Sequence, residues 1–298
     1  MLKRWNIYLK EMYPLGSRIL VALIYFFEIY FVLLLNQKVY NFKLSIQEGV
    51  GVYTIFSFLL ILRIADDFKD YDLDCRLFPH RALPSGRVYK KDLRWLLLLV
   101  VGTSTLANIF FMNNRIWFIF LYTYGLLMSL WFFSKDKLQA SLPMALVTHN
   151  PVMMILNLYI LSFVCNKYQL PYFTWPFILL AFTMYFPSLI WEISRKVRAP
   201  EDETEYVTYS KLFGYQKVTR FVQMLTLVDI VTNFILLWQL SKVGVLALLI
   251  NVGWMTWRFN QFIQNPNQFK LIDKVETYTL ITEAIMVVSV VVHLLGVS

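Results

Sequence analysis

The stretch that decides the interpretation of this chain is Arg63-Ile64-Ala65-Asp66-Asp67-Phe68-Lys69-Asp70-Tyr71-Asp72-Leu73-Asp74, which directly follows an apolar run. On a continuous helix, Asp67, Asp70 and Asp74 would share one face, because their spacing is i, i+3, i+7. Carboxylates this dense repel one another unless cations neutralise them, and their oxygen atoms suit a hard ion such as Mg²⁺. The spacing also favours an ion pair between Arg63 and Asp67. The simpler alternative is a solvated, charged loop between two membrane helices.

A turn with basic side chains follows the aspartates. Pro79, Pro84 and Gly86 do not continue a helix and favour a defined turn, and this turn carries Arg81 and Arg87. Acidic and arginine side chains in one cluster have a direct chemical use, because the acids hold Mg²⁺ and the arginines bind the phosphate oxygens that the metal leaves free.

The composition is that of a membrane protein. Of the 298 residues, 58% are hydrophobic and 16% are charged, whereas soluble domains have about 45–50% and ~25%. The apolar residues come in blocks of about twenty, the length that crosses a bilayer as a helix. Nine spans are predicted, at residues 18–36, 47–65, 93–112, 116–134, 143–164, 172–192, 219–240, 243–258 and 278–296.

The distribution of basic residues predicts the orientation. With nine spans, alternate loops fall on opposite sides of the membrane, and the positive-inside rule places the more basic side in the cytoplasm. That side contains the N-terminus and the aspartate stretch. The net charge of +9 is therefore a topology signal, and no nucleic-acid partner is implied. The other side receives only a few of the 28 Lys and Arg residues, namely Lys38, Lys43, Arg115, Lys167 and Lys242.

A second charged cluster follows the sixth span, at residues 192–205. Pro200 is placed to begin a short helix with acidic residues in its first turn, on which Glu201 and Glu205 would share a face. The two clusters are four spans apart on the same predicted side, which favours a duplicated four-helix unit. Facing each other, they would clamp one diphosphate through Mg²⁺ ions.

Three further segments carry structural signals. Residues 1–17 have the pattern of an amphipathic interfacial helix. Thr148-His149-Asn150-Pro151 predicts a kinked helix inside a span. Glu28, Asp229 and Glu283 lie inside spans, where ionisable groups are costly unless they have partners; hydrogen bonding between helices is the simpler interpretation, and an ion path in a transporter is the alternative.

These residues resemble the UbiA superfamily of intramembrane prenyltransferases. The first motif of that family is Asn/Asp-Asp-x-x-Asp-x-x-x-Asp at the end of span 2, which residues 66–74 fit, and residues 81–88 resemble the Arg-Pro-x-x-x-Gly-like turn that follows, with Ala82 at the commoner Pro. The tail of the second motif matches residues 208–214. The acidic part of this second motif differs from the family pattern. Lys196 falls near the first expected Asp, and Glu201 falls near the second. Glu192, one turn before Lys196, is a candidate to replace the missing carboxylate.

The resemblance implies an all-α polytopic membrane protein, with one domain over residues 1–298. Its nine-helix bundle would consist of two four-helix halves plus a ninth helix, around a central cavity capped on the cytoplasmic side. The implied location is the inner or plasma membrane, with a cytoplasmic N-terminus and the active site near the cytoplasmic face. No obligate protein partner is evident.

The implied activity is Mg²⁺-dependent transfer of a prenyl group from an isoprenyl diphosphate to an aromatic or lipophilic acceptor. The second motif's departure leaves open a terpene cyclase that uses no acceptor, and a transporter is the remaining alternative, although transporter sites usually lie at the midplane. The predicted catalytic residues are Asp67, Asp70, Asp74 and Lys196. The predicted diphosphate-binding residues are Lys69, Arg81, Arg195 and Arg198. The predicted Mg²⁺ ligands are Asp66, Asp67, Asp70, Asp74, Glu192, Glu201 and Glu205.

Overall fold

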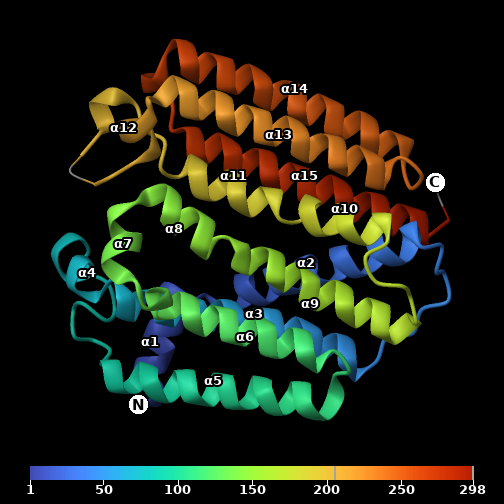
Figure 1. Ribbon diagram of the computed structural model, residues 1–298, viewed down its shortest axis with the longest axis horizontal. Coiled ribbons are helices and arrows are strands. Elements are labelled where there is room, and N and C mark those ends of the chain that lie inside the picture. Colours follow the sequence, from blue (N-terminus) through green and yellow to red (C-terminus); the bar gives the residue numbers. More distant parts are fainter. Residues whose placement is uncertain (205, 297–298) are drawn as a thin grey trace. The chain divides into compact units, whose positions relative to one another are not determined.

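The computed structural model describes residues 1–204 and 206–296, which form helices and the turns between them (Figure 1). Contacts divide the chain into two compact units. Unit 1 comprises Met1–Phe27, Asn41–Phe133 and Cys165–Leu170, and unit 2 comprises Glu28–Tyr40, Ser134–Val164 and Pro171–Ser298. The units are not consecutive halves of the sequence, because α2 and α9 each contribute residues to both. The single domain over residues 1–298 stays a prediction.

Unit 1 is built around α3, which packs against both α5 and α6, while α1 packs against α5 (Figure 1). A capping box fixes the start of α3, since the Ser45 side chain accepts from the helix backbone and Glu48 accepts from the Ser45 backbone. The helices of unit 1 are α1 (Leu2–Met12), the first part of α2 (Leu15–Asn36), α3 (Ile46–Lys69), α4 (Tyr71–Leu77), α5 (Lys90–Phe111), α6 (Arg115–Ser129) and the 3₁₀ turn η1 (Trp131–Phe133).

Unit 2 is built around three long helices, in which α14 packs against both α13 and α15, and α11 packs against α13 and α15 (Figure 1). The helices of this unit are α7 (Lys135–Ala140), α8 (Leu142–His149), α9 (Pro151–Tyr168, except its end), α10 (Trp175–Thr183), α11 (Phe186–Ser194), α12 (Tyr209–Phe213), α13 (Tyr215–Leu237), α14 (Lys242–Gln264) and α15 (Leu271–Leu294), with the 3₁₀ turns η2 (Pro200–Asp202) and η3 (Pro266–Gln268).

The helices confirm a polytopic membrane protein. Within residues 1–204 and 206–296, seven helical segments are long and apolar enough to cross a membrane, and they coincide with seven of the nine predicted spans. Of the other two predicted spans, 243–258 lies within α14, whereas in 116–134 the helix α6 ends at Ser129 and the turn η1 follows. The helices therefore lie where the sequence places them, while the count of nine crossings is not confirmed.

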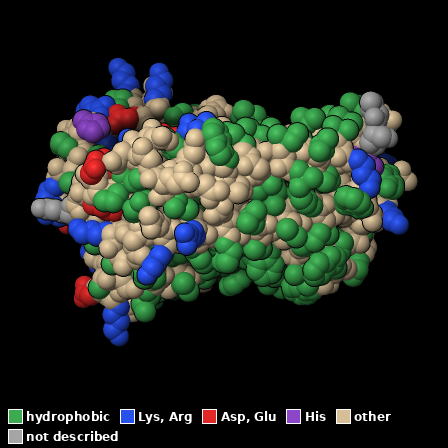
Figure 2. Space-filling view, turned by 90° about the horizontal axis from the view of Figure 1, so that it is seen from above, with side chains coloured by type: hydrophobic (Ala, Val, Ile, Leu, Met, Phe, Trp, Pro, Cys, Tyr) green, Lys and Arg blue, Asp and Glu red, His purple; other side chains and the backbone are tan. Residues whose placement is uncertain are grey.

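The surface of the helices is suited to lipid. On the face shown in Figure 2, hydrophobic side chains lie open over a wide area that charged side chains do not enter. Large apolar residues are among the most exposed, for example Ile116 at 81% and Leu280 at 70%. Outside a bilayer such an apolar surface would be an aggregation liability.

The predicted kink in the fifth span is confirmed. α8 ends at His149 and α9 begins at Pro151, because the proline lacks an N–H and its ring clashes with the preceding turn. The sixth span is interrupted in the same way between α10 and α11, where Pro187 occupies the first turn of α11.

Hydrogen bonds between buried side chains connect the helices of unit 1. The Asn108 amide on α5 donates to Thr54 Oγ1 on α3 at 2.8 Å, and Tyr122 OH on α6 donates to Ser104 Oγ on α5 at 2.7 Å. Asn108, Thr54 and Ser104 are fully buried. In an apolar setting these bonds fix which faces of the helices meet.

Replacing Asn108 by Leu is expected to lower the stability of unit 1 by about 1 kcal/mol, the size of one hydrogen bond between membrane helices. Thermal unfolding of the purified protein in mild detergent measures this as a lower midpoint. The exposed Asn113 provides the matched control, and Asn113→Leu is expected to leave the midpoint unchanged. Equal midpoints for the two variants would contradict the structural role of Asn108.

Candidate functional site

Asp67 is the most enclosed carboxylate of the aspartate stretch, at 4% exposure. Arg63, one turn earlier on α3, donates from Nη2 to Oδ1 at 2.5 Å. Tyr8 on α1 donates from its hydroxyl to Oδ2, also at 2.5 Å. The ion pair predicted between Arg63 and Asp67 is therefore confirmed, and a phenol from a segment far away in the sequence completes it.

The contact with Tyr8 depends on the docking of α1. Arg4 donates from Nε to Asp92 at 2.5 Å, and the Trp5 indole donates to the Asp92 backbone oxygen at 2.8 Å. Tyr8 is fully buried in a hydrophobic cluster with residues of α3 and α5. Burial, together with the neighbouring Asp67 carboxylate, raises the pKa of the Tyr8 phenol, so it keeps its proton and acts as the donor. The amphipathic N-terminal helix is thus part of the aspartate site.

Asp74 is held by the turn that follows it. Arg81 donates from Nη1 to both Asp74 oxygens, at 2.9 and 2.8 Å, and its guanidinium lies 3.9 Å from the centre of the Phe78 ring. Gly86 has φ of +76°, a conformation that glycine adopts without strain. The turn predicted from its prolines and glycine therefore brings Arg81 to the aspartates.

Asp66 and Asp70 have different neighbours. The charges that act most strongly on Asp66 are those of Lys69, Asp70, Arg63 and Asp67. Lys69 also lies 4.0 Å from the centre of the Trp131 ring, and its ammonium donates to the Met128 carbonyl at 3.4 Å. The end of α6 and the 3₁₀ turn after it therefore position the lysine beside these two carboxylates.

The prediction that Asp67, Asp70 and Asp74 share one helical face is wrong, because the helix is not continuous. α3 ends at Lys69 and α4 begins at Tyr71, with Asp70 at the junction in a non-helical conformation (φ −100°, ψ 11°). Asp67 nevertheless lies close enough to Asp74 and Arg81 to interact electrostatically with both. The spacing of the motif keeps the carboxylates near one another, and the break at Asp70 decides how they are grouped.

The second cluster belongs to unit 2 and is organised around Glu192. Arg195 donates to both oxygens of Glu192, at 2.6 and 2.8 Å, and Lys196 Nζ lies 3.0 Å from Oε1. Lys196, which stands where a family aspartate is expected, is therefore in contact with the candidate replacement carboxylate. Arg198 donates from Nη1 to Thr204 Oγ1 at 3.0 Å.

Glu203 is a residue that the sequence reasoning missed. Its carboxylate accepts from Thr208 Oγ1 at 2.7 and 2.8 Å and from Ser210 Oγ at 2.5 Å. The Arg198 backbone N–H donates to the same Ser210 oxygen at 2.9 Å. The hydroxyl pattern Thr-x-Ser shortly after an acidic run is the signal that could have indicated this bond.

The predicted helix at Pro200 is only the 3₁₀ turn η2, which ends at Asp202. Glu201 is exposed. Glu205 lies outside the described residues, so the predicted shared face of these two acids stays a prediction.

The acids inside the spans of unit 2 interact with one another. Glu28 on α2 is 3% exposed, and its strongest charged neighbour is Glu283 on α15, with which it also hydrogen-bonds. Asp229 on α13 accepts from the Asn233 amide at 3.0 Å. The contact of Glu28 with Glu283 joins two helices, as the sequence favoured over an ion path, whereas the bond of Asp229 with Asn233 lies within α13.

The site contains no ready-made metal cage. Across residues 1–204 and 206–296, no three acidic, histidine or cysteine side chains converge to hold a metal ion. Asp67 and Asp74 are each engaged by an arginine instead. In these two pairs the acidic and basic side chains neutralise each other.

Comparison with known proteins identifies the fold. No family model and no curated protein matches the chain. It does match the solved structure of digeranylgeranylglyceryl phosphate synthase in membranes, with a TM-score of 0.64 over 98% of this chain and 99% of that one, at 14% sequence identity. That protein is a UbiA-type prenyltransferase, so the predicted resemblance is confirmed at the level of the fold.

Tyr8→Phe is expected to lower the thermal midpoint of the protein, because a buried acceptor that loses its donor costs about 1–3 kcal/mol. Backbone amides of α1 are also expected to exchange faster with D₂O, since the helix loses its bond to α3. Tyr40→Phe is the matched control, because Tyr40 is 60% exposed. Identical exchange in the two variants would show that the phenol does not hold α1 in place.

Proposed function

We propose that this chain is a membrane prenyltransferase, which ionises an isoprenyl diphosphate at the aspartate cluster and transfers the prenyl group to a lipophilic or aromatic acceptor. The observation that carries the proposal is the grouping of the aspartates, Arg81 and Lys69 at the end of α3, in a chain whose fold matches a UbiA-type prenyltransferase over its whole length. Fold alone does not determine activity, so the proposal depends on this cluster.

The donor chemistry of the cluster fits Mg²⁺. Its candidate ligands are carboxylate oxygens, and Mg²⁺ usually takes only one or two of these, completing its shell with waters and substrate phosphates. A cage of three protein groups is therefore not required. When bound, Mg²⁺ would neutralise charge on the leaving diphosphate.

We assign the direct contacts with the ion to Asp66 and Asp70. Their charges act on each other at the end of α3, so a divalent cation would relieve their repulsion. Asp67 and Asp74 are already engaged by Arg63 and Arg81. Their role in the proposal is to hold these arginines in place, so that Arg81, together with Lys69, presents positive charge to the diphosphate.

The roles of the unit 2 residues stay predictions. These comprise the metal ligands Glu192, Glu201 and Glu205, and the basic residues Arg195, Lys196 and Arg198. We also propose nine membrane crossings with a cytoplasmic N-terminus and a capped central cavity. α14 is 23 residues long, about 34 Å, which exceeds the ~30 Å hydrocarbon core.

Asp66→Asn and Asp70→Asn are each expected to reduce turnover roughly 100-fold or more, since each removes charge that acts on the reacting group. Membranes containing the full chain are given labelled C10, C15 and C20 prenyl diphosphates with Mg²⁺, with and without cell extract as acceptor source. Products are then identified by mass spectrometry. Asp72→Asn, an exposed neighbour in the same segment, is the control and is expected to keep wild-type turnover.

The same experiment separates the alternatives. A prenylated product that forms only when extract is present supports transfer. A cyclic hydrocarbon or terpene alcohol formed without extract would replace transfer by cyclisation. Full turnover in both Asp66→Asn and Asp70→Asn would contradict the assigned ligands, and no diphosphate release by any form of the protein would contradict the enzyme itself.

A further inference from the structure

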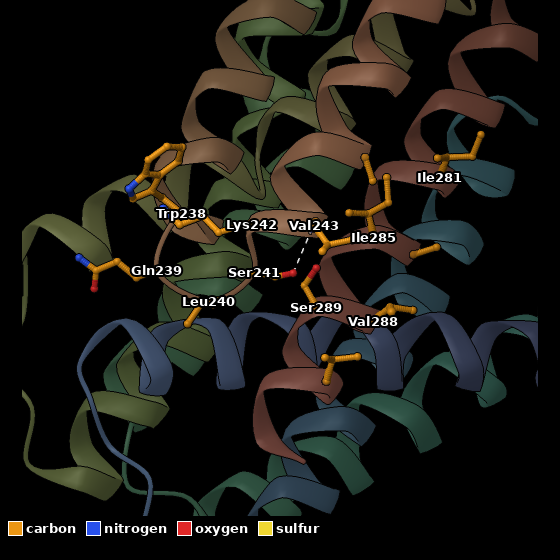
Figure 3. Close-up of a pocket in the computed structure, with 14 residues that line it drawn as sticks. Trp238, Gln239, Leu240, Ser241, Lys242, Val243, Ile281, Ile285, Val288 and Ser289 are labelled. Carbon is orange, nitrogen blue, oxygen red and sulfur yellow. Dashed lines mark hydrogen bonds between the residues drawn. The ribbon is translucent and has the colours of Figure 1, made fainter. Parts of the chain in front are cut away.

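A groove opens in unit 2 beside the turn between α13 and α14 and against the second half of α15 (Figure 3). Its volume is about 720 Å³, within the ~300–1,000 Å³ typical of ligand sites. Its lining residues belong neither to the aspartate cluster nor to the segment 192–205. A ligand of this groove would therefore use residues that the proposed prenyl transfer does not.

One part of the groove is apolar. Ile281, Ile285, Val288 and Val292 line it from α15 and Ala247 from α14. The α15 residues recur every three to four positions, so they form one continuous stripe along the helix. A stripe of this kind accommodates an extended hydrocarbon chain.

The other end of the groove is polar and basic. Gln239, Ser241 and Lys242 line it, and in Figure 3 Gln239 lies away from Ile281 and Ile285. The Lys242 ammonium lies 3.6 Å from the centre of the Trp238 ring. Trp and Lys at the ends of membrane helices are typical of the headgroup level of a bilayer.

The charge at this end lacks an acidic counterpart. The groove is lined by no Asp or Glu, and within the described part of the chain no carboxylate forms an ion pair with Lys242. A phosphate group complements a single lysine, and one positive charge matches a monoanionic phosphodiester. The lining thus selects an amphiphile with an apolar chain and an anionic head.

We propose that the groove binds an anionic glycerophospholipid, with one acyl chain along the α15 stripe and its phosphate beside Lys242. The groove is open to the surrounding bilayer, since Val243 is 79% exposed and Val288 is 59% exposed. Such a lipid enters sideways from the membrane and packs against both α14 and α15.

The headgroup part of the proposal is tested by native mass spectrometry. The full chain in mild detergent is titrated with phosphatidylglycerol or phosphatidylcholine, and the retained lipids are counted. Lys242→Gln is expected to weaken retention of phosphatidylglycerol about fivefold, the effect of one basic residue near an anionic lipid. Retention of phosphatidylcholine is expected to fall less, because its choline group offsets the charge of the phosphate. Lys217→Gln, an exposed lysine on α13 outside the groove, is expected to behave as the wild type.

The chain-binding part is tested by filling the groove. Ala284→Trp, on the lining, is expected to abolish retention of the lipid molecule. Leu280→Trp on the same helix is the control, because Leu280 is 70% exposed and outside the groove. Equal retention by Lys242→Gln and Lys217→Gln, or by the two tryptophan variants, would overturn the proposal and indicate unspecific lipid at the protein surface.

Discussion

The ion pair between Arg63 and Asp67, completed by Tyr8, is the interaction on which the aspartate site depends. A carboxylate this enclosed is costly at the end of a membrane helix unless it is paired and hydrogen-bonded. One partner comes from α3 itself and the other from α1, 59 residues away in sequence. The docking of α1 is therefore coupled to the charge state of the cluster. Arg81 forms the corresponding ion pair with Asp74, and this pair links the turn after α4 to the site.

This pairing divides the aspartates by role. Two carboxylates hold basic side chains in fixed positions, and two lie together with Lys69 at the junction of α3 and α4. Preorganised charge is the main means by which a site stabilises a leaving diphosphate, because the groups need not reorganise as charge develops. At 14% identity to the synthase of the same fold, this local arrangement supports the function more strongly than overall similarity does.

The sequence predicted the features that depend on local patterns. The apolar blocks predicted the positions of the helices. The i, i+4 spacing predicted the ion pair of Arg63 with Asp67, and Pro151 predicted the kink between α8 and α9. It did not predict features that depend on distant packing. From the sequence, Tyr8 is expected only to be part of an interfacial helix, because no residue near it in the sequence indicates its buried partner, Asp67. The break at Asp70 was missed as well, since the i, i+3, i+7 spacing assumes a continuous helix.

The central claim is that the cluster binds a prenyl diphosphate through Mg²⁺. The most direct measurement is the affinity of the purified chain for an unreactive prenyl thiolodiphosphate, determined by calorimetry with Mg²⁺ and again after chelation of divalent ions. We predict that chelation weakens binding at least about tenfold, because the cluster then lacks the cation that joins its carboxylates to the diphosphate. Equal affinity under both conditions would contradict the claim.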